Sequence, residues 1–280
     1  MDFEEIRRLI ITALFSDDVL SNLLVLKGGN AISLVYGYGS RSSLDLDFSI
    51  ETDFPDLEDA RVRIINAISS RFTSAGFVVF DENFAPKPAL SRTARWGGYV
   101  LSFKIIEYRK YQSMHSDPGA LRRNAATIGP GHARTFRVEI SKFENCSDKT
   151  GVELDDHTVY VYSPAMLVIE KLRAICQQMP EYPIRRHAAA RARDFYDIHS
   201  LIANAGVNFA DPQNLALVTP IFGAKDVPLS LLAKIENQRE FHRPDWPAVV
   251  ASVSGPMEEY DFYFDFVVRQ AALLKSLWEK

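Results

Sequence analysis

The chain alternates between segments with helical hydrophobic spacing and short runs with the spacing of a strand. Apolar side chains recur three or four positions apart over residues 2–20, as on one face of a helix. Leu44, Leu46 and Phe48 instead alternate with polar residues, which is typical of a half-buried strand. In chain order we expect a helix over 2–20, a strand over 23–27, a helix over 30–37, a strand over 44–50, a helix over 56–75, a strand starting at 77, and strands over 99–108, 135–141 and 157–161.

The second half of the chain has a different pattern. Ser163-Pro164 is typical of a helix start, with serine as the N-cap and proline at the first helical position. From there the spacing is mostly helical to residue 280. The sequence therefore predicts an α+β protein with a mixed α/β domain over 1–160 and a helical domain over 161–280.

The strand expected over 44–50 carries two acidic residues, Asp45 and Asp47, on the same face. Two neighbouring carboxylates repel each other, and a divalent cation neutralises that repulsion. Gly28 and Gly29 precede the helix expected over 30–37, where backbone N–H groups can approach a phosphate. Lys27 either points toward the same phosphates or lies in water at a strand end. This region predicts a site for a metal-bound nucleoside triphosphate.

Lys27-Gly28-Gly29, followed by Arg41-x-Ser43-x-Asp45-x-Asp47-Phe48, resembles the AbiEii/AbiGii toxin family of abortive-infection and toxin–antitoxin systems. That family is a branch of the DNA polymerase beta-like nucleotidyltransferases. The resemblance implies a polymerase beta-like mixed sheet with flanking helices in the first domain. It also implies transfer of a nucleoside monophosphate from an NTP, with Mg²⁺ or Mn²⁺ as cofactor. The Ser43 hydroxyl would hold the strand end or lie near the metal.

A third carboxylate is needed opposite the first pair for two-metal phosphoryl transfer. The best candidate is Glu139, within the strand expected over 135–141. If Val138 and Ile140 face the core, Glu139 faces the other way, beside Arg137. Glu139 is then either a metal ligand or an ordinary exposed strand residue, and the resemblance favours the ligand.

Two later strings, residues 170–174 (Glu-Lys-Leu-Arg-Ala) and 191–198 (Arg-Ala-Arg-Asp-Phe-Tyr-Asp-Ile), are similar to later motifs of the same toxins. The resemblance implies that Lys171 contacts the nucleotide phosphates and that Asp194 completes the active site. The helical domain would thereby complete the site of the first domain. Asp194 and Asp197 are three residues apart on one helical face. The alternative is that Lys171 and Asp194 form an ordinary salt bridge between helices.

Composition excludes several other classes of protein. No apolar run approaches the ~20 residues that cross a bilayer, and the N-terminus lacks the apolar core of a signal peptide. Cys146 and Cys176 show neither a disulfide framework nor metal-ligand spacing, so we expect packed thiols in the reducing cytoplasm.

The net charge of −4 hides basic segments in the middle of the chain. Eleven Lys or Arg oppose three acidic residues over 87–142, and six oppose one over 171–193. These segments either bind a polyanion or are simply solvated. Combined with the resemblance, they suggest an RNA acceptor such as the tRNA 3′ end, and a cognate antitoxin encoded nearby. The alternatives are a protein or small-molecule acceptor, or a nucleotide-binding protein without catalysis. The arginines concerned are Arg122, Arg123, Arg134, Arg185 and Arg186.

Overall fold

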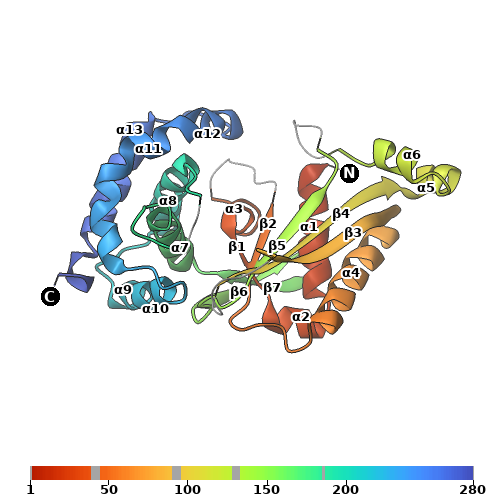
Figure 1. Cartoon of the computed structure of the whole chain (residues 1–280), viewed down its shortest axis with the longest axis horizontal. Helices are drawn as coiled ribbons and strands as arrows, with labels where there is room; N and C mark the ends of the chain where they lie inside the picture. The colour runs from red at the N-terminus through yellow and green to blue at the C-terminus, as the bar shows by residue number, and fades with distance from the viewer. Residues whose placement is uncertain (1, 39–44, 90–95, 128–132, 185–186, 280) are drawn as a thin grey trace. The chain divides into compact units, whose positions relative to one another are not determined.

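The computed structural model describes residues 2–38, 45–89, 96–127, 133–184 and 187–279 (Figure 1). The chain forms two compact units. The first unit consists of Met1–Asn30 and Ser43–Val161, and the second of Ala31–Ser42 and Tyr162–Lys280. The change of unit at Val161 adjoins the boundary expected at residue 160. The segment after Asn30 belongs to the second unit, which the sequence did not indicate.

The described strands of the chain form one seven-stranded sheet in the order β3-β4-β5-β2-β1-β7-β6. Both parallel and antiparallel pairs occur, because β2 is parallel to β5 and antiparallel to β1. This mixed sheet with helices confirms the predicted α+β class. The strands are β1 (Val25–Lys27), β2 (Leu46–Ser49), β3 (Phe77–Lys87), β4 (Gly98–Glu107), β5 (Phe136–Ser141), β6 (Lys149–Leu154) and β7 (His157–Tyr162).

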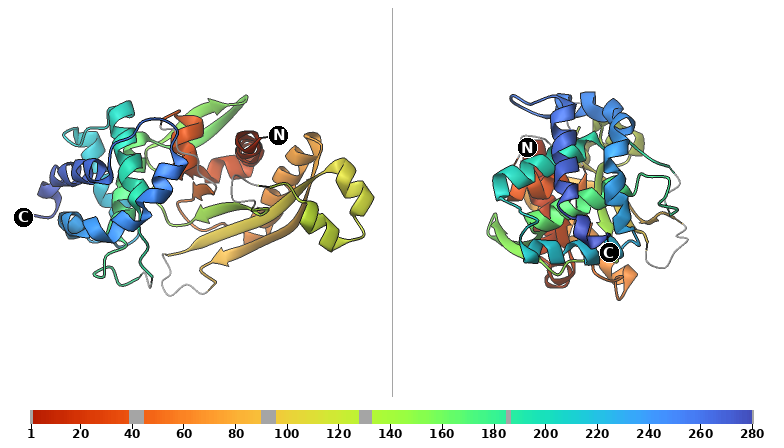
Figure 2. Two further views of the ribbon diagram at one scale, coloured as in Figure 1. Left: turned by 90° about the horizontal axis from the view of Figure 1, so that it is seen from above. Right: turned by 90° about the vertical axis from the view of Figure 1, so that its left-hand side faces the viewer.

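The central strands have one apolar and one polar face. Phe48, Val138 and Ile140 are almost completely buried, as their alternation with polar residues predicts. Helices α1 (Phe3–Phe15) and α4 (Leu57–Ser74) lie on the same side of β3 and β4 (Figure 2, left). Their buried side chains complete the core of the first unit. The opposite face carries the polar residues of β2, β4 and β5.

The remaining helices of the first unit differ from those that the sequence predicts. The helix expected over 2–20 is interrupted, because Asp17 begins a new helix by accepting hydrogen bonds from the backbone of Val19 and Leu20. We did not expect β6 or two short helices of this unit. The further helices are α2 (Asp18–Leu23), α3 (Gly28–Asn30), α5 (Tyr108–Met114) and α6 (Pro118–Asn124).

The second unit is helical in its described part, as predicted. Ser163 accepts a hydrogen bond from the backbone of Met166, and Pro164 is the first residue of α7, which confirms the predicted helix start. None of the described helices is both long and apolar enough to cross a membrane. The elements are a π-helix (Ala31–Val35), α7 (Pro164–Cys176), α8 (Ala192–Ala205), α9 (Pro212–Ala216), α10 (Val218–Gly223), α11 (Arg239–His242), α12 (Trp246–Ser252) and α13 (Tyr260–Ala272), with 3-10 helices at Leu229–Gln238, Arg243–Asp245 and Lys275–Leu277.

Candidate functional site

Asp47 lies at the centre of the polar face of the sheet. Its register partner on the antiparallel strand β1 is Lys27, and its partner on the parallel strand β5 is Glu139. Register partners on neighbouring strands point to the same face, about 4.8 Å apart along the hydrogen-bonding direction. The sheet therefore brings together two acidic residues, Asp47 and Glu139, that are far apart in sequence.

Gly28 approaches the Asp47 side chain very closely. A Cβ atom on Gly28 would lie 2.5 Å from Oδ2 of Asp47, which is closer than any side chain tolerates. Gly28 also has a φ of +72°, in the left-handed region that favours glycine. The turn after β1 therefore needs glycine at this position for two independent reasons, and it holds backbone against the carboxylate.

Asp45 lies one residue before β2 and is exposed. Its backbone carbonyl accepts a 2.6 Å hydrogen bond from Nδ2 of Asn30, which is fully buried. Oδ1 of Asn30 in turn accepts a 2.8 Å bond from Nη1 of Arg7 on α1. Because a buried amide with both ends bonded has a fixed orientation, Asn30 fixes the backbone at the start of the acidic strand.

Lys27 does not lie in water at a strand end. It is buried, and its ammonium is 3.4 Å from Oε1 of Glu144, which is also buried. A charge in the protein interior requires such a partner. The structure therefore gives Lys27 an ion pair that we did not expect, and its predicted contact with phosphates stays a prediction.

Glu139 faces away from the core, as its alternation with Val138 and Ile140 predicts. Its two carboxylate oxygens accept hydrogen bonds of 2.5 and 2.6 Å from Nζ of Lys87, the last residue of β3. Among the described residues, no three Asp, Glu, His or Cys side chains converge into a group that could hold a metal ion. Asp47 and Glu139 thus share a face of the sheet, but the described side chains do not form a complete set of metal ligands there.

In the second unit, Lys171 of α7 lies between two carboxylates of α8. Its Nζ is 3.1 Å from Oδ1 of Asp194 and 2.7 Å from Oδ2 of Asp197. Lys171 is only 5% exposed and Asp194 only 1%. The salt bridge between helices, which the sequence left open as an alternative, is present. The role of Lys171 toward phosphates stays a prediction.

The same cluster is fixed from a third side by Arg191. Its Nε donates a hydrogen bond to Oδ2 of Asp194, and its backbone N–H donates a 3.0 Å bond to Nδ1 of His242. Burial alone would raise the pKa of the Asp194 carboxyl, but the charges of Arg191 and Lys171 outweigh it and hold that pKa below its ordinary value. Asp194 is therefore a carboxylate that is fixed by two cations.

Several predicted residues lie elsewhere. Ser43, Arg185 and Arg186 are outside the described residues. Arg122 and Arg123 lie on α6, where Arg122 pairs with Asp81 and Arg123 approaches Asp117, while Arg134 donates to the backbone carbonyl of Ala125. These arginines of the first unit therefore have partners within the protein.

The sequence matches the model of a family described as nucleotidyl transferase AbiEii toxin, type IV toxin–antitoxin system, over residues 9–266. The chain belongs to this family. It is therefore a nucleotidyltransferase of the AbiEii toxins, and the match confirms the resemblance inferred from the motifs around Asp47 and Lys171.

Two solved structures show the same fold. One is a "putative nucleotidyltransferase" from Helicobacter pylori, 18% identical, with a TM-score of 0.51 over 99% of this chain and 97% of that one. The other is JHP933 from Helicobacter pylori, 16% identical, with a TM-score of 0.50 over 98% of this chain and 91% of that one. At these identities the likeness extends to the fold alone. No curated protein sequence matches the chain.

Sequence reasoning missed several residues around the AbiEii motifs. Asn30 directly follows the Gly-Gly turn. Buried backbone groups near such a turn need hydrogen-bond partners, so the role of Asn30 could have been inferred from the sequence. Lys87, Glu144 and His242 carry no comparable local signal. Their contacts depend on which distant segments the fold brings together.

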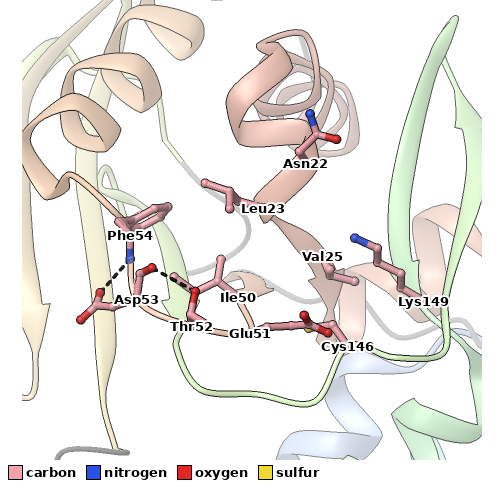
Figure 3. A pocket seen from close by; sticks show the side chains of 10 residues that line it. All are labelled: Asn22, Leu23, Val25, Ile50, Glu51, Thr52, Asp53, Phe54, Cys146 and Lys149. Carbon is pink, nitrogen blue, oxygen red and sulfur yellow. Dashed lines mark hydrogen bonds between the residues drawn. The ribbon is translucent and has the colours of Figure 1, made fainter.

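A pocket of about 120 Å³ lies beyond the C-terminal end of β2 (Figure 3). Val25 of β1, the segment after β2 and Lys149 of β6 contribute side chains to it. None of the predicted site residues lines it, because Asp45 and Asp47 lie at the beginning of β2. The full lining is Asn22, Leu23, Val25, Ile50, Glu51, Thr52, Asp53, Phe54, Cys146 and Lys149.

Proposed function

We propose that this AbiEii-family enzyme transfers a nucleoside monophosphate from an NTP to an RNA acceptor, with help from a divalent cation. The observation that carries the proposal is the register of Asp47 with Glu139 on the polar face, beside the close approach of Gly28. A nucleotidyl transfer requires positioning and charge neutralisation more than covalent chemistry by the protein. Acidic residues on a rigid sheet next to a glycine turn suit that requirement.

The residues proposed to hold the cation are Asp45, Asp47 and Glu139. Carboxylate oxygens are hard ligands of the kind that Mg²⁺ and Mn²⁺ prefer, so the donor set fits. Such a cation, when bound, neutralises phosphate charge and favours deprotonation of an acceptor hydroxyl. Asn30 keeps the backbone of Asp45 in place, and Gly28 leaves space beside Asp47.

For the triphosphate we propose contacts with the Gly28–Gly29 turn, with Ser43 and Lys27, and with Lys171 of the second unit. The support for Lys171 comes from its place in the family motif, not from its contacts, which are with Asp194 and Asp197. These two aspartates would orient the ammonium. A lysine that is held in one position is a suitable point charge for a phosphate.

The acceptor is proposed to be RNA, such as the tRNA 3′ end, because the middle of the chain is rich in arginine and lysine. The family description also supports an antitoxin encoded nearby as the partner in the system. A transfer to a protein or to a small molecule is the alternative that shares the same metal chemistry.

The proposal is tested with purified protein, Mg²⁺, total RNA and each labelled NTP in turn. We expect label in RNA together with release of pyrophosphate, and neither when the cation is chelated. Asp47→Asn should reduce transfer by about 10²- to 10³-fold, since one ligand of a charged site is lost. Its thermal midpoint should stay close to that of the wild type, because Asp47 carries no core packing.

Glu51→Gln is the matched control, an exposed acidic residue shortly after the same strand. It should transfer at the wild-type rate. Near-normal transfer by folded Asp47→Asn would overturn the proposed site. Label in protein or in a small molecule would move the acceptor to the alternative class, and NTP binding without pyrophosphate would mean that the site does not catalyse.

A further inference from the structure

Lys87 and Glu139 come from strands that are not neighbours. Lys87 ends β3, and its register partner on β4 is Gly98; Glu139 lies one strand further, on β5. The Lys87 and Glu139 side chains meet on the polar face of the sheet. The Lys87 side chain extends across β4, where Val100 is the register partner of Glu139, and its Nζ lies 2.5 and 2.6 Å from the two Glu139 oxygens.

Glu139 therefore has a cation on one side and the carboxylate of its register partner Asp47 on the other. A divalent cation bound by Glu139 needs the oxygens that already accept hydrogen bonds from Lys87. The Lys87 side chain is 49% exposed and the Glu139 side chain 25%. Ion pairs with this much solvent access contribute little stability, so Lys87 can leave Glu139 at small cost.

We propose that Lys87 is a positioning residue that competes with a divalent cation for Glu139 and thereby sets the metal affinity of the site. The inference rests on the proposed metal role of Glu139. In this arrangement Lys87 neutralises Glu139 beside Asp47, and the cation takes over that neutralisation when Lys87 leaves.

The test measures Mn²⁺ binding directly, by the electron paramagnetic resonance signal of free Mn²⁺, with neither NTP nor acceptor present. Lys87→Met keeps the length of the side chain and removes its charge. We expect its dissociation constant for Mn²⁺ to fall by roughly two- to fivefold, the size of an exposed ion pair. Lys87→Arg keeps the charge and should bind Mn²⁺ much like the wild type.

Two further variants make the result decisive. Lys110→Met removes another exposed lysine of the first unit, which pairs with Glu107, and should not change the affinity. Glu139→Gln should weaken Mn²⁺ binding, and Lys87→Met should give no gain in that background, because the two residues would then have nothing to compete for.

Each outcome separates this inference from the proposed function. If Glu139→Gln weakens binding but Lys87→Met leaves it unchanged, the competition is wrong and the metal site stands. A gain from Lys87→Met that persists without Glu139 would reduce the effect to general surface charge and would also overturn the inference. If Glu139→Gln has no effect, Glu139 is not a ligand, and the inference and the third-ligand assignment both fail while the Asp47→Asn transfer assay still tests catalysis.

Discussion

The acidic residues of the two units differ most in their access to solvent. In the first unit, Asp47 and Glu139 lie half-buried on a polar sheet face, and Glu139 is paired with a lysine that is 49% exposed. In the second unit, Asp194 and Lys171 are 1% and 5% exposed, and their charges contact each other. Both sets combine carboxylates with a lysine. Only the first set (Asp47, Glu139 and Lys87) is exposed enough to exchange a protein partner for a ligand at a small cost in free energy.

This difference in solvent access predicts which substitutions change ligand binding without changing stability. Removing one member of a buried ion pair leaves the other charge without compensation, which costs far more than losing an exposed pair. We therefore expect changes in the first set to alter ligand binding with little effect on folding. Changes in the second set should reduce stability as well.

The largest combined effect is expected for Lys171→Ala, because it removes the cation between Asp194 and Asp197. The free energy of unfolding should fall by about 3–5 kcal/mol, and transfer per folded molecule by about 10²-fold if the lysine also binds phosphate. Denaturant titration and initial rates on one preparation measure both quantities.

Lys234→Ala is the control for this variant, because Lys234 forms an exposed pair with Glu181 in the same unit. Its stability should change by less than about 1 kcal/mol. Wild-type transfer by the folded fraction of Lys171→Ala would leave the lysine a purely stabilising role and would sharpen the contrast between the units. Unchanged stability would contradict the buried ion pair.

A smaller effect is expected for Gly28→Ala. Its new Cβ would lie 2.5 Å from Oδ2 of Asp47, so the carboxylate must move. Gly76→Ala is the matched control, since Gly76 also has a positive φ, +82°, but nothing lies within 4 Å of its added Cβ. Both variants should lose about 1–2 kcal/mol from backbone strain.

Only Gly28→Ala should also lose activity, by about tenfold or more, because a displacement of roughly 1 Å at a catalytic group is costly. Thermal midpoints and transfer rates of the two variants give the comparison. Equal activity in both would show that the approach of Gly28 to Asp47 has no part in catalysis.

The last prediction concerns the stability of the second unit as a function of pH, with no expected change in the chemistry of transfer. Burial lowers the pKa of His242 from 6.5 to about 4, while the charge of Asp194 raises it and that of Arg191 lowers it further. Between pH 4 and pH 6.5 the unfolded chain therefore binds more protons at this histidine than the folded chain does. The stability from this histidine is complete above pH 6.5 and is lost as the pH falls toward 4, by about 2 kcal/mol from pH 7 to pH 5.

His242→Gln should abolish that part of the pH dependence and flatten the profile of unfolding free energy between pH 7 and pH 5. His115→Gln changes an exposed histidine of the first unit and should keep the wild-type slope. A wild-type slope in His242→Gln would contradict the assignment of the proton to His242.

The parts of this structure that follow from local pattern were predictable. Alternation around Asp47 and around Glu139 predicted the two strands and the faces of these two side chains, because a strand repeats every two residues. The strand of Asp47 begins at Leu46, so Asp45 precedes it and does not lie within it as predicted. Ser163-Pro164 gave the start of α7 for an equally local reason. The family motifs also lie in these segments, so their residues could be named in advance.

The partners of those residues were not predictable in the same way. Lys87 and Glu139 are 52 residues apart, and Lys27 and Glu144 are 117 apart. Hydrophobic spacing shows which side chains share a face of one element, but not which strands become neighbours. The interruption between α1 and α2 shows a second limit, because the capping bonds of Asp17 outweigh a continuous helical pattern.

The order of strands in the sheet also has a consequence for the synthesis of this toxin-family enzyme. Strand β2 begins at Leu46, soon after its neighbour β1 ends at Lys27, but its other neighbour, β5, begins only at Phe136. Pairing across such a sequence separation forms slowly, and it waits for the ribosome to deliver the later strand. A nascent chain that stops before Phe136 carries Asp45 and Asp47 without Glu139. Under the proposed mechanism such a fragment is inactive, so the cell that makes this enzyme is not exposed to its activity until about half of the chain has been translated.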